Sequence, residues 1–567
     1  MQITAVWLAP MLGSLREILR PGVLQGIVAL SLLLNLWRID WGLPDRWHPD
    51  EITQRAEHMA GSFSLNPDYF VYGSFHYYPI IALAVLPVKL TNRIFGVPAT
   101  EKRIAGILSR MLSAVLGSGI VVVMYLLGQM LFNRVAGLIA AFLLTLTMGF
   151  VNISHFASTD IASLFWFSLS GLMAGYAFLY GSRRSHLLAG LFAGLAAAVK
   201  YVGGLALLAL VCAHVLRYKE IRSILVLGIL MGVFGFILGN PVVLFAFFEF
   251  AEGFLEEGAV NAARATDRPV AFLPLIGELE NALGVPLFIL SLFGCVYSFK
   301  LLGIRGWRRQ ALFVWSMLLP YYVLFGSRHV STLRYVVPLV PFLHILTGKM
   351  MADLLVAKSR ALRAASLMVL LLVAGYSLLY VVAADFEFSN DSRYLAARWI
   401  RENIPQGSKI EITSYGPPIS RSAYVIIERP HDNRIDRAVS VAMDGNAYQV
   451  LYDGLRVLRS YLTGKSGDLY VPWYEKAIQR YQSEISAFDI SIEGLESRAP
   501  DYLVVSELYF VRFSGERSSP EAHFFEALFS GQTGYREMAQ FKYRLFTWLT
   551  PHVEFVNPRI HIFVRGR

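Results

Sequence analysis

Two adjacent carboxylates, Asp50 and Glu51, follow Pro49 in the polar stretch from residue 39 to residue 75. Carboxylates placed in this way could supply a general base, which takes a proton from an attacking hydroxyl group. The same residues also fit a solvated loop in which Asp50 is the N-cap of a short helix. This stretch alone leaves both interpretations open.

A third carboxylate, Asp160, ends the sequence Ser-His-Phe-Ala-Ser-Thr-Asp between two strongly apolar stretches. A carboxylate in apolar surroundings is costly, and within a membrane protein it marks a functional site by default. Asp160 also fits the first turn of a helix, where it would act as a cap, and the two roles are compatible. The residues predicted to be catalytic are therefore Asp50, Glu51 and Asp160.

The composition indicates a membrane protein. Of 567 residues, 55% are hydrophobic and 16% are charged, whereas soluble domains carry roughly a quarter charged residues. The charge is also uneven, because residues 385–567 hold 45 of the 92 charged side chains. An ordinary soluble enzyme is thereby excluded, and the chain is expected to have two parts in different solvents.

Apolar stretches long enough for membrane helices recur up to about residue 383. A helix needs roughly 20 apolar residues to cross the bilayer core. The two cysteines, Cys212 and Cys295, lie far apart inside such stretches and predict neither a disulfide framework nor a Cys-based metal site. The predicted segments are 21–38, 76–96, 103–132, 134–153, 160–181, 185–199, 201–217, 221–247, 283–303, 310–326, 335–352 and 361–383.

The positive-inside rule orients these segments. The net charge of +10 comes from the apolar part, where Lys and Arg in short loops indicate orientation and not a nucleic-acid partner. The basic loop around Lys358 and Arg360 is expected inside, which puts the C-terminal part and the acidic loop 248–282 outside. With the N-terminus expected inside, an outside C-terminus needs an odd total, 11 or 13 crossings.

One inconsistency in this topology concerns the number of crossings before Asp160. The polar loop 39–75 and Asp160 are both expected outside, so an even number of crossings must separate them. Three apolar segments lie between them. The weakest is 76–96, which contains Pro79, Pro87 and Lys89.

Several cations fall on the outer side, against the positive-inside trend. Lys200, Arg328 and Arg334 are placed there, and Arg264 and Arg268 join them in the outer loop. An anionic ligand such as a lipid-linked phosphate would explain them, since Arg grips phosphate bidentately and Lys as a point charge. Contacts with lipid headgroups would explain any single one equally well.

Residues 385–567 are predicted to form a separate outer α/β domain. Residues 391–403 have helical spacing, whereas 409–413, 501–511 and 561–564 have the apolar content of strands. The fold class is thus an α-helical polytopic membrane protein, residues 1–384, with a C-terminal extracytoplasmic α/β domain.

Taken in order, these motifs resemble the GT-C membrane glycosyltransferases, closest to the family 39-like branch of protein O-mannosyltransferases and aminoarabinose transferases. The resemblance rests on the outer Asp-Glu pair, the Ser-His-Phe-x-x-x-Asp context, Gly-Leu-Ala-Ala-Ala-Val-Lys-Tyr at 194–201 and Leu-Arg-Tyr-Val-Val-Pro-Leu at 333–339. It covers about residues 20–380.

The resemblance implies an inverting transferase that moves a sugar from a polyprenyl-phosphate donor to an acceptor hydroxyl outside the membrane. Asp50 would be the base with Glu51 beside it, Asp160 the second carboxylate, and Lys200 with Arg334 or Arg328 the partners of the donor phosphate. The acceptor would be a protein, a lipid or a glycan, with membrane lipids around the enzyme.

A metal ion is left open at this stage. Histidines near the carboxylates, with His48 and His58 as the candidates, could hold a divalent ion, yet no His-Glu-x-x-His or comparable spacing occurs. No cofactor is predicted with certainty.

A transporter or lipid flippase is the alternative, with Asp160 and Lys200 lining a path. Transporters commonly contain two related halves, and the sequence shows no such repeat. A receptor or scaffold anchored by the membrane part is a third class, for which a dozen spans are excessive.

Overall fold

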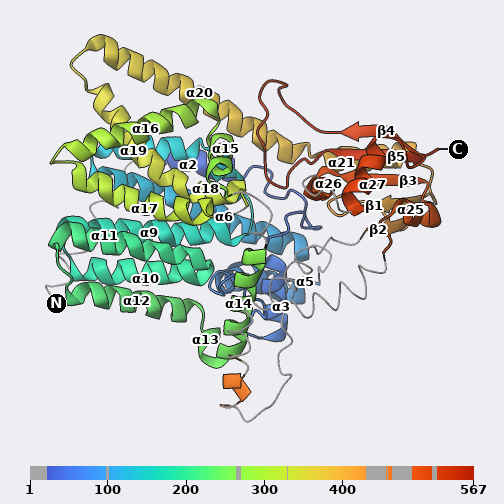
Figure 1. Cartoon of the computed structure of the whole chain (residues 1–567), viewed down its shortest axis with the longest axis horizontal. Helices are drawn as coiled ribbons and strands as arrows, with labels where there is room; N and C mark the ends of the chain where they lie inside the picture. The colour runs from blue at the N-terminus through green and yellow to red at the C-terminus, as the bar shows by residue number, and fades with distance from the viewer. Residues whose placement is uncertain are drawn as a thin grey trace.

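Apolar helices run side by side through the first two thirds of the chain, and a mixed sheet follows them (Figure 1). The structure is a computed structural model. It describes residues 22–96, 101–263, 270–328, 330–429, 488–513 and 520–566, with a few isolated positions between 455 and 462. Arg264, Arg268 and His329 lie outside the described residues.

The helices of the bundle coincide with the apolar stretches of the sequence. They are α2 (Val23–Asn35), α6 (Glu101–Leu131), α7 (Arg134–Thr145), α8 (Met148–Ser154), α9 (Thr159–Tyr180), α10 (Arg183–Val199), the 3₁₀ turn η3 (Tyr201–Leu205), α11 (Ala206–Tyr218), α12 (Ser223–Gly239), α16 (Val285–Gly303), α17 (Arg308–Gly326), α18 (Leu333–Val336), η4 (Val337–Leu339), α19 (Val340–Leu355) and α20 (Arg360–Ser389).

Shorter helices lie where the bundle meets the rest of the chain. They include two helices, α14 and α15, in the segment predicted as the outer loop 248–282. The set is α3 (Thr53–Ser62), α4 (Tyr77–Ile80), η1 (Ile81–Val85), α5 (Leu86–Phe95), α13 (Val242–Phe245), α14 (Phe247–Ala263) and α15 (Phe272–Leu283).

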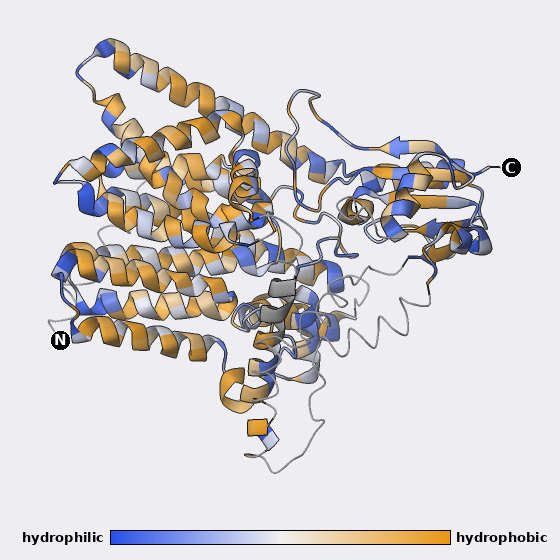
Figure 2. Ribbon diagram, in the orientation of Figure 1, coloured by the Kyte–Doolittle hydropathy of each residue, from blue (hydrophilic) through white to orange (hydrophobic). Residues whose placement is uncertain are grey.

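The chain is a multi-pass membrane protein. Seven described helices are long and apolar enough to cross a membrane, or eight if the bent pair α7 and α8 counts as one span. Figure 2 shows hydrophobic residues along the bundle and hydrophilic residues at its ends and in the C-terminal part. The predicted fold class, a polytopic helical membrane protein with a C-terminal α/β domain, is confirmed.

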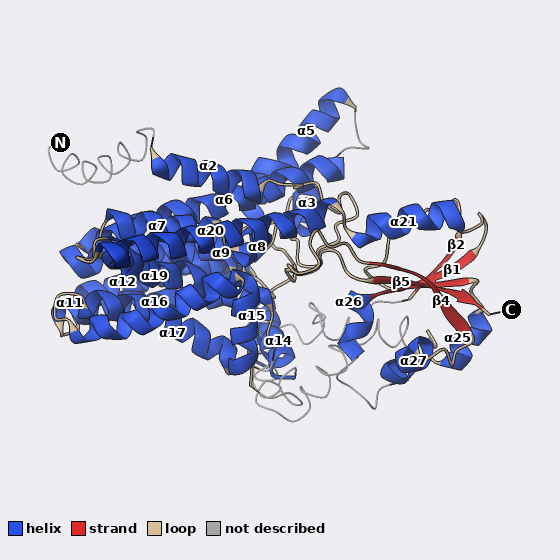
Figure 3. Cartoon of the chain, turned by 90° about the horizontal axis from the view of Figure 1, so that it is seen from above, coloured by secondary structure: helices blue, strands red, loops and turns tan. Residues whose placement is uncertain are grey.

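The helix Tyr77–Phe95, formed by α4, η1 and α5, accounts for the inconsistency in the crossing count. Just before it, Phe75 N donates to Ala198 O at the end of α10 (3.1 Å), and near its end Asn92 donates to Glu101 at the start of α6. Both ends of this helix therefore lie at the same end of the bundle, and α5 projects from there (Figure 3).

We infer that this segment does not cross, although its length and composition would permit it. Two crossings then separate the polar loop from Asp160, as the orientation requires. Apart from Tyr77–Phe95, six described helices and the bent pair α7 and α8 are long and apolar enough to cross, and α2 and α12 are shorter apolar helices.

The C-terminal domain contains a five-stranded sheet in the order β2-β1-β3-β5-β4. Strand β1 pairs parallel with β2 and β3, while β5 pairs antiparallel with β3 and β4. The strands are β1 (Lys409–Ile412), β2 (Val425–Glu428), β3 (Tyr502–Ser506), β4 (Tyr535–Phe541) and β5 (Ile560–Arg565), and the helices are α21 (Ser392–Asn403), α25 (Ile492–Arg498), α26 (Glu507–Phe510) and α27 (Pro520–Phe529).

Alternation along the strands builds a core on each face of this sheet. Leu503 and Val505 of β3 pack with α27, whereas Val504 packs with Ile400 of α21, as expected when successive side chains point to opposite faces. The predicted helix 391–403 is confirmed. The predicted strand 501–511 is too long, because the chain turns into α26 at Glu507, where Glu507 N donates to Arg559 O.

Candidate active site

Four segments far apart in the sequence bring two carboxylates and two cations together at the end of the bundle that faces the C-terminal domain. Arg334 of α18 donates to Asp50 Oδ2, and Lys200 Nζ lies 2.6 Å from Asp160 Oδ1. The four side chains are between 10% and 24% exposed. The structure therefore joins residues that the sequence singled out separately.

Asp50 is fixed by the way its loop pairs with the segment before α9. Ile52 N donates to Ala157 O at 3.0 Å, and Ala157 N donates to Glu51 Oε1 at 3.2 Å. The backbone N–H of Asp50 donates to His48 Nδ1. These contacts hold the loop of Asp50 against the residues that precede Asp160.

Asp160 stands in the first turn of α9, where the positive end of the helix dipole favours a carboxylate. The N-cap is Ser158, whose hydroxyl accepts from Asp160 N. The capping role considered for Asp160 thus belongs to Ser158. One oxygen of the Asp160 carboxylate accepts from Ser158 Oγ at 3.2 Å, and the other faces Lys200.

Lys200 is placed by a close backbone approach between the first outer loop and the end of α10. Gly73 N donates to Val199 O at 3.2 Å. A Cβ at Gly73 would lie 1.9 Å from Ala198 O, so no larger residue fits there. This packing requires glycine, and it sets the end of α10 beside Tyr72 and the Asp50 loop.

Burial and neighbouring charges act in opposite directions on Asp50. Burial favours the neutral acid, but Arg334, His48 and Lys200 outweigh it and hold the pKa of Asp50 below its usual value. Asp50 is therefore a carboxylate at neutral pH. Within the described ranges, its second oxygen, Oδ1, accepts one long hydrogen bond of 3.4 Å, from Tyr72.

Glu51 faces away from this cluster although it is next to Asp50 in the sequence. Its carboxylate accepts from Arg110 Nε at 2.6 Å and from Arg110 Nη2 at 3.0 Å, and both side chains are buried. Arg110 also donates to the carbonyls of Ile39 and Trp41. This geometry supports a structural role in holding the loop.

Arg328, just after α17, is connected to the site through aromatic side chains. Its guanidinium is 5.3 Å from the centre of the Phe325 ring, and Phe325 stacks on Tyr335 at 4.4 Å. Lys200 Nζ is 6.0 Å from the centre of the Tyr335 ring. Aromatic rings thus link Arg328 to Lys200.

The two histidines considered as metal ligands have different surroundings in the structure, one buried and one exposed. His48 stacks on Phe156 at 4.1 Å, and burial lowers its pKa to about 4. His58 lies exposed on α3. Among the described residues, no three His, Cys, Asp or Glu side chains are arranged to hold a metal ion.

Two residues of the site were missed by the sequence interpretation. Arg110 lies inside an apolar segment, and an intramembrane charge is itself a signal. Glu554 lies 3.5 Å from Arg334 Nε and comes from the C-terminal domain. No sequence signal marks Glu554, because only the fold brings residue 554 to the membrane part.

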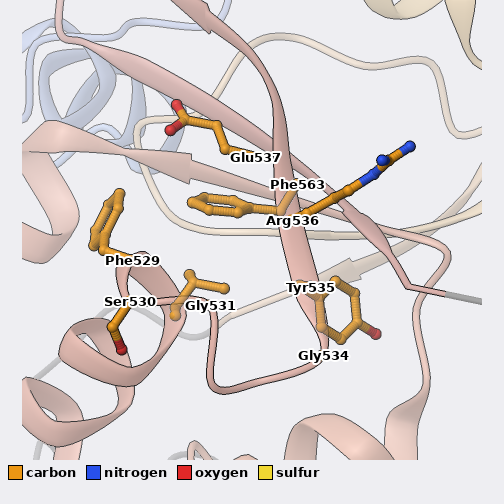
Figure 4. Close-up of a pocket in the computed structure, with 9 residues that line it drawn as sticks. Phe529, Ser530, Gly531, Gly534, Tyr535, Arg536, Glu537 and Phe563 are labelled. Atoms are coloured by element: carbon orange, nitrogen blue, oxygen red, sulfur yellow. The ribbon is translucent and has the colours of Figure 1, made fainter.

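A pocket of about 410 Å³ opens in the C-terminal domain, between α27 and the sheet (Figure 4). Its lining includes Phe529, Tyr535, Arg536, Glu537 and Phe563. All of these residues come from α27, β4 and β5, so none of the carboxylates and cations named above contributes to it. The pocket is separate from the candidate active site.

A family model matches residues 94–252, and its description is dolichyl-phosphate-mannose-protein mannosyltransferase. The predicted resemblance to GT-C glycosyltransferases is confirmed. The matched segment contains Asp160 and Lys200 but neither Asp50 nor Arg334. The enzyme class that it supports is a glycosyltransferase.

Solved structures of membrane glycosyltransferases are similar to this chain at low identity. The oligosaccharyltransferase AglB from Archaeoglobus fulgidus, in complex with an inhibitory peptide and a dolichol-phosphate, is 14% identical, with 93% of this chain and 75% of that chain covered and a TM-score of 0.46. ArnT from Cupriavidus metallidurans bound to undecaprenyl phosphate is 12% identical, with 94% and 97% covered and a TM-score of 0.47.

The arabinofuranosyltransferase AftD from Mycobacteria is 15% identical, with 96% of this chain and 41% of that chain covered and a TM-score of 0.41. At these scores the structures assign no role to any residue of this chain. A comparison with curated proteins gave no match.

Proposed function

We propose that this protein is an inverting glycosyltransferase that moves a sugar from a polyprenyl-phosphate donor to an acceptor hydroxyl on the outer face of the membrane. The observation that carries the proposal is the paired arrangement of Asp50 with Arg334 and of Asp160 with Lys200 at one end of an apolar bundle. The C-terminal domain, residues 385–567, lies on the same side, and the acceptor is a protein, a lipid or a glycan.

The proposed reaction is a direct displacement. The acceptor hydroxyl gives its proton to Asp50 Oδ1 while its oxygen attacks the anomeric carbon. The bond from that carbon to the phosphate oxygen breaks, and the polyprenyl phosphate leaves as an anion. Because a single base drives a single displacement, the anomeric centre inverts.

The two cations would stabilise the leaving phosphate. An ammonium has three N–H donors and a guanidinium has five, so Lys200 and Arg334 keep donors for a ligand beyond their carboxylate partners. Donors fixed in a partly dehydrated site are typically worth a few kcal/mol for developing charge. Asp160 would then orient Lys200 through their 2.6 Å contact.

The position of the cluster favours the enzyme over a transporter. A transporter binds its substrate near the middle of the membrane, whereas Asp50, Asp160 and their cations lie at the end of the bundle beside the C-terminal domain. The direct test is transfer from a radiolabelled polyprenyl-phosphate sugar to a crude envelope acceptor by the reconstituted protein. The absence of labelled product above the level of a protein-free control would contradict the proposal.

Substitution of the cations should weaken use of the donor. Arg334→Lys and Lys200→Gln are each expected to cost about 1 to 3 kcal/mol in the donor kcat/KM, the scale of a charge-assisted hydrogen bond. Lysine should replace Arg334 poorly because it loses the planar fork of donors. Arg328→Lys tests whether Arg328, whose guanidinium lies over the Phe325 ring, also contacts the phosphate.

The measurement is transfer rate against donor concentration at fixed acceptor. Arg536→Lys, in the separate C-terminal pocket, is the matched control and should keep the wild-type donor dependence. Wild-type donor dependence in all three site variants would show that phosphate recognition lies elsewhere.

Topology supplies a further prediction. Phe63, at the end of α3, is 94% exposed, and Val356, between α19 and α20, is 74% exposed. With Cys212 and Cys295 replaced, Phe63→Cys should react with a membrane-impermeant maleimide added outside intact cells. Val356→Cys should react only after the membrane is opened, because it belongs to the opposite end of the bundle. The reverse labelling pattern would invert the orientation and refute the outer active site.

A further inference from the structure

A segment of the C-terminal domain, Leu549–Asn557, leaves the sheet and packs against the membrane part. Leu549, Val553 and Val556 are buried in one apolar cluster with Trp41 and Phe156, which flank the Asp50 loop and α9. The two domains thus share a core beside the active site.

Hydrogen bonds on either side of Glu554 hold this segment in place. Asn281 of α15 donates to His552 O and accepts from His552 N, both at 3.0 Å. On the other side, Arg393 donates to Phe555 O and Asn557 N donates to Asp391.

The backbone of the segment is strained as well as fixed. Phe555 and Asn557 adopt positive φ angles of 62° and 51°. A left-handed backbone is costly for a bulky residue such as Phe555 and persists only where surrounding contacts impose it. The residue between Val553 and Phe555 is therefore held in a defined position.

That residue is Glu554. Its side chain is 15% exposed, and its Oε1 lies 3.5 Å from Arg334 Nε. Arg334 donates to Asp50 on its other side, and Nε has no hydrogen-bond partner within the described part of the chain. One guanidinium is thus shared by carboxylates from the membrane part and the C-terminal domain.

The charges at this point do not balance when every group is ionised. Among the residues that the structure describes, the ion pairs of Asp50, Asp160 and Glu554 involve two cations, Arg334 and Lys200. Burial raises the pKa of Glu554 to about 7; Arg334 opposes this shift, while Asp50, Asp160 and Glu278 add to it. Glu554 therefore changes charge near neutral pH.

We propose that Glu554 is a positioning residue of the active site, which competes with the anionic group of the donor for Arg334. This inference rests on the proposed function. Ionised Glu554 holds part of the Arg334 charge, and neutral Glu554 releases that charge to a phosphate. The C-terminal domain thereby controls how strongly the membrane part binds its donor.

The sign of the pH effect follows directly. Below pH 7 the Glu554 side chain takes a proton from water and Arg334 is free for the phosphate. As the pH rises through 7, the carboxylate forms and donor affinity falls. Glu554→Gln is permanently neutral, so it should bind at pH 8 as tightly as the low-pH form does.

The experiment measures undecaprenyl phosphate binding to the full chain in detergent at pH 6 and pH 8. Relative to wild type, Glu554→Gln should bind about equally at pH 6 and roughly tenfold more tightly at pH 8, the factor for one charge-assisted hydrogen bond. The phosphate's own titration is common to both proteins and cancels in this comparison. Glu428→Gln, an exposed carboxylate in the same domain, should behave as wild type.

Two outcomes would overturn the inference. One is the same pH dependence in Glu554→Gln and wild type, and the other is a lowered melting temperature as the only change, which would make Glu554 merely structural. If Glu554→Gln does not fold, Glu554→Asp provides the test. Because this variant retains a carboxylate, it must still bind undecaprenyl phosphate more weakly at pH 8 than at pH 6. Failure of the proposed function is distinct, because wild type itself would then not bind the phosphate.

Discussion

Transfer by the Asp50→Asn variant is expected to fall by roughly 10² to 10⁴-fold, the usual range for loss of a general base. Asparagine keeps the size of the side chain, and its single amide oxygen can still accept a hydrogen bond from Arg334. It cannot take the proton of an acceptor hydroxyl. Turnover should therefore drop while the protein still binds the donor, because the phosphate contacts belong to Arg334 and Lys200.

The matched control is Asp45→Asn, the same substitution at an exposed position of the same loop. It should leave turnover within about twofold, since surface substitutions have small effects. Both variants should melt near the wild-type temperature. A folded Asp50→Asn protein with undiminished turnover would remove Asp50 from the mechanism and leave Asp160 as the next candidate base.

The helices of the bundle could be predicted because each apolar stretch had to satisfy its backbone internally in a bilayer. The stretch 76–96 was the exception, since hydropathy measures composition and does not report where the two ends of a helix lie. Only the contacts of Phe75 and Asn92 place both ends together. The strand predicted at 501–511 failed for a related reason, because apolar residues after Ser506 also suit the buried side of α26.

The residues of the candidate active site also differ in how far the sequence could predict them. Asp160 could be named from its charge in apolar surroundings, Asp50 from the carboxylate pair after Pro49, and Lys200 and Arg334 from their expected place on the outer side. The structure brings all four together. Their pairing could not be predicted, because it depends on the approach of α9, α10 and α18. Glu554 could not be predicted from the sequence, since it meets Arg334 only through the contact between the C-terminal domain and the membrane part.

Glu51 is the residue for which the sequence suggests a catalytic role and the structure supports a structural one. The sequence pairs it with Asp50, yet its carboxylate is 3% exposed and receives a two-pronged contact from Arg110, itself 2% exposed. Burial favours its neutral form, but Arg110 outweighs burial and keeps the pKa of Glu51 below its usual value. The loop that carries Asp50 is attached to α6 through this ion pair.

Glu51→Gln should therefore cost about 3 to 5 kcal/mol of stability, because it leaves the Arg110 charge buried without its counter-charge. Unfolding in detergent by heat and by denaturant would measure the loss. Glu428→Gln is the matched control: its ion pair with Arg421 is exposed to solvent, so about 1 kcal/mol or less is expected.

A second substitution separates the structural role of Glu51 from a catalytic one. Replacing the pair together, with Glu51→Gln and Arg110→Met, removes the unpaired charge and should recover part of the lost stability. If Glu51 only holds the loop, turnover should recover with it. A double variant that regains stability and stays inactive, or a Glu51→Gln protein that is fully stable and inactive, would instead show that the Glu51 carboxylate takes part in the reaction beside Asp50.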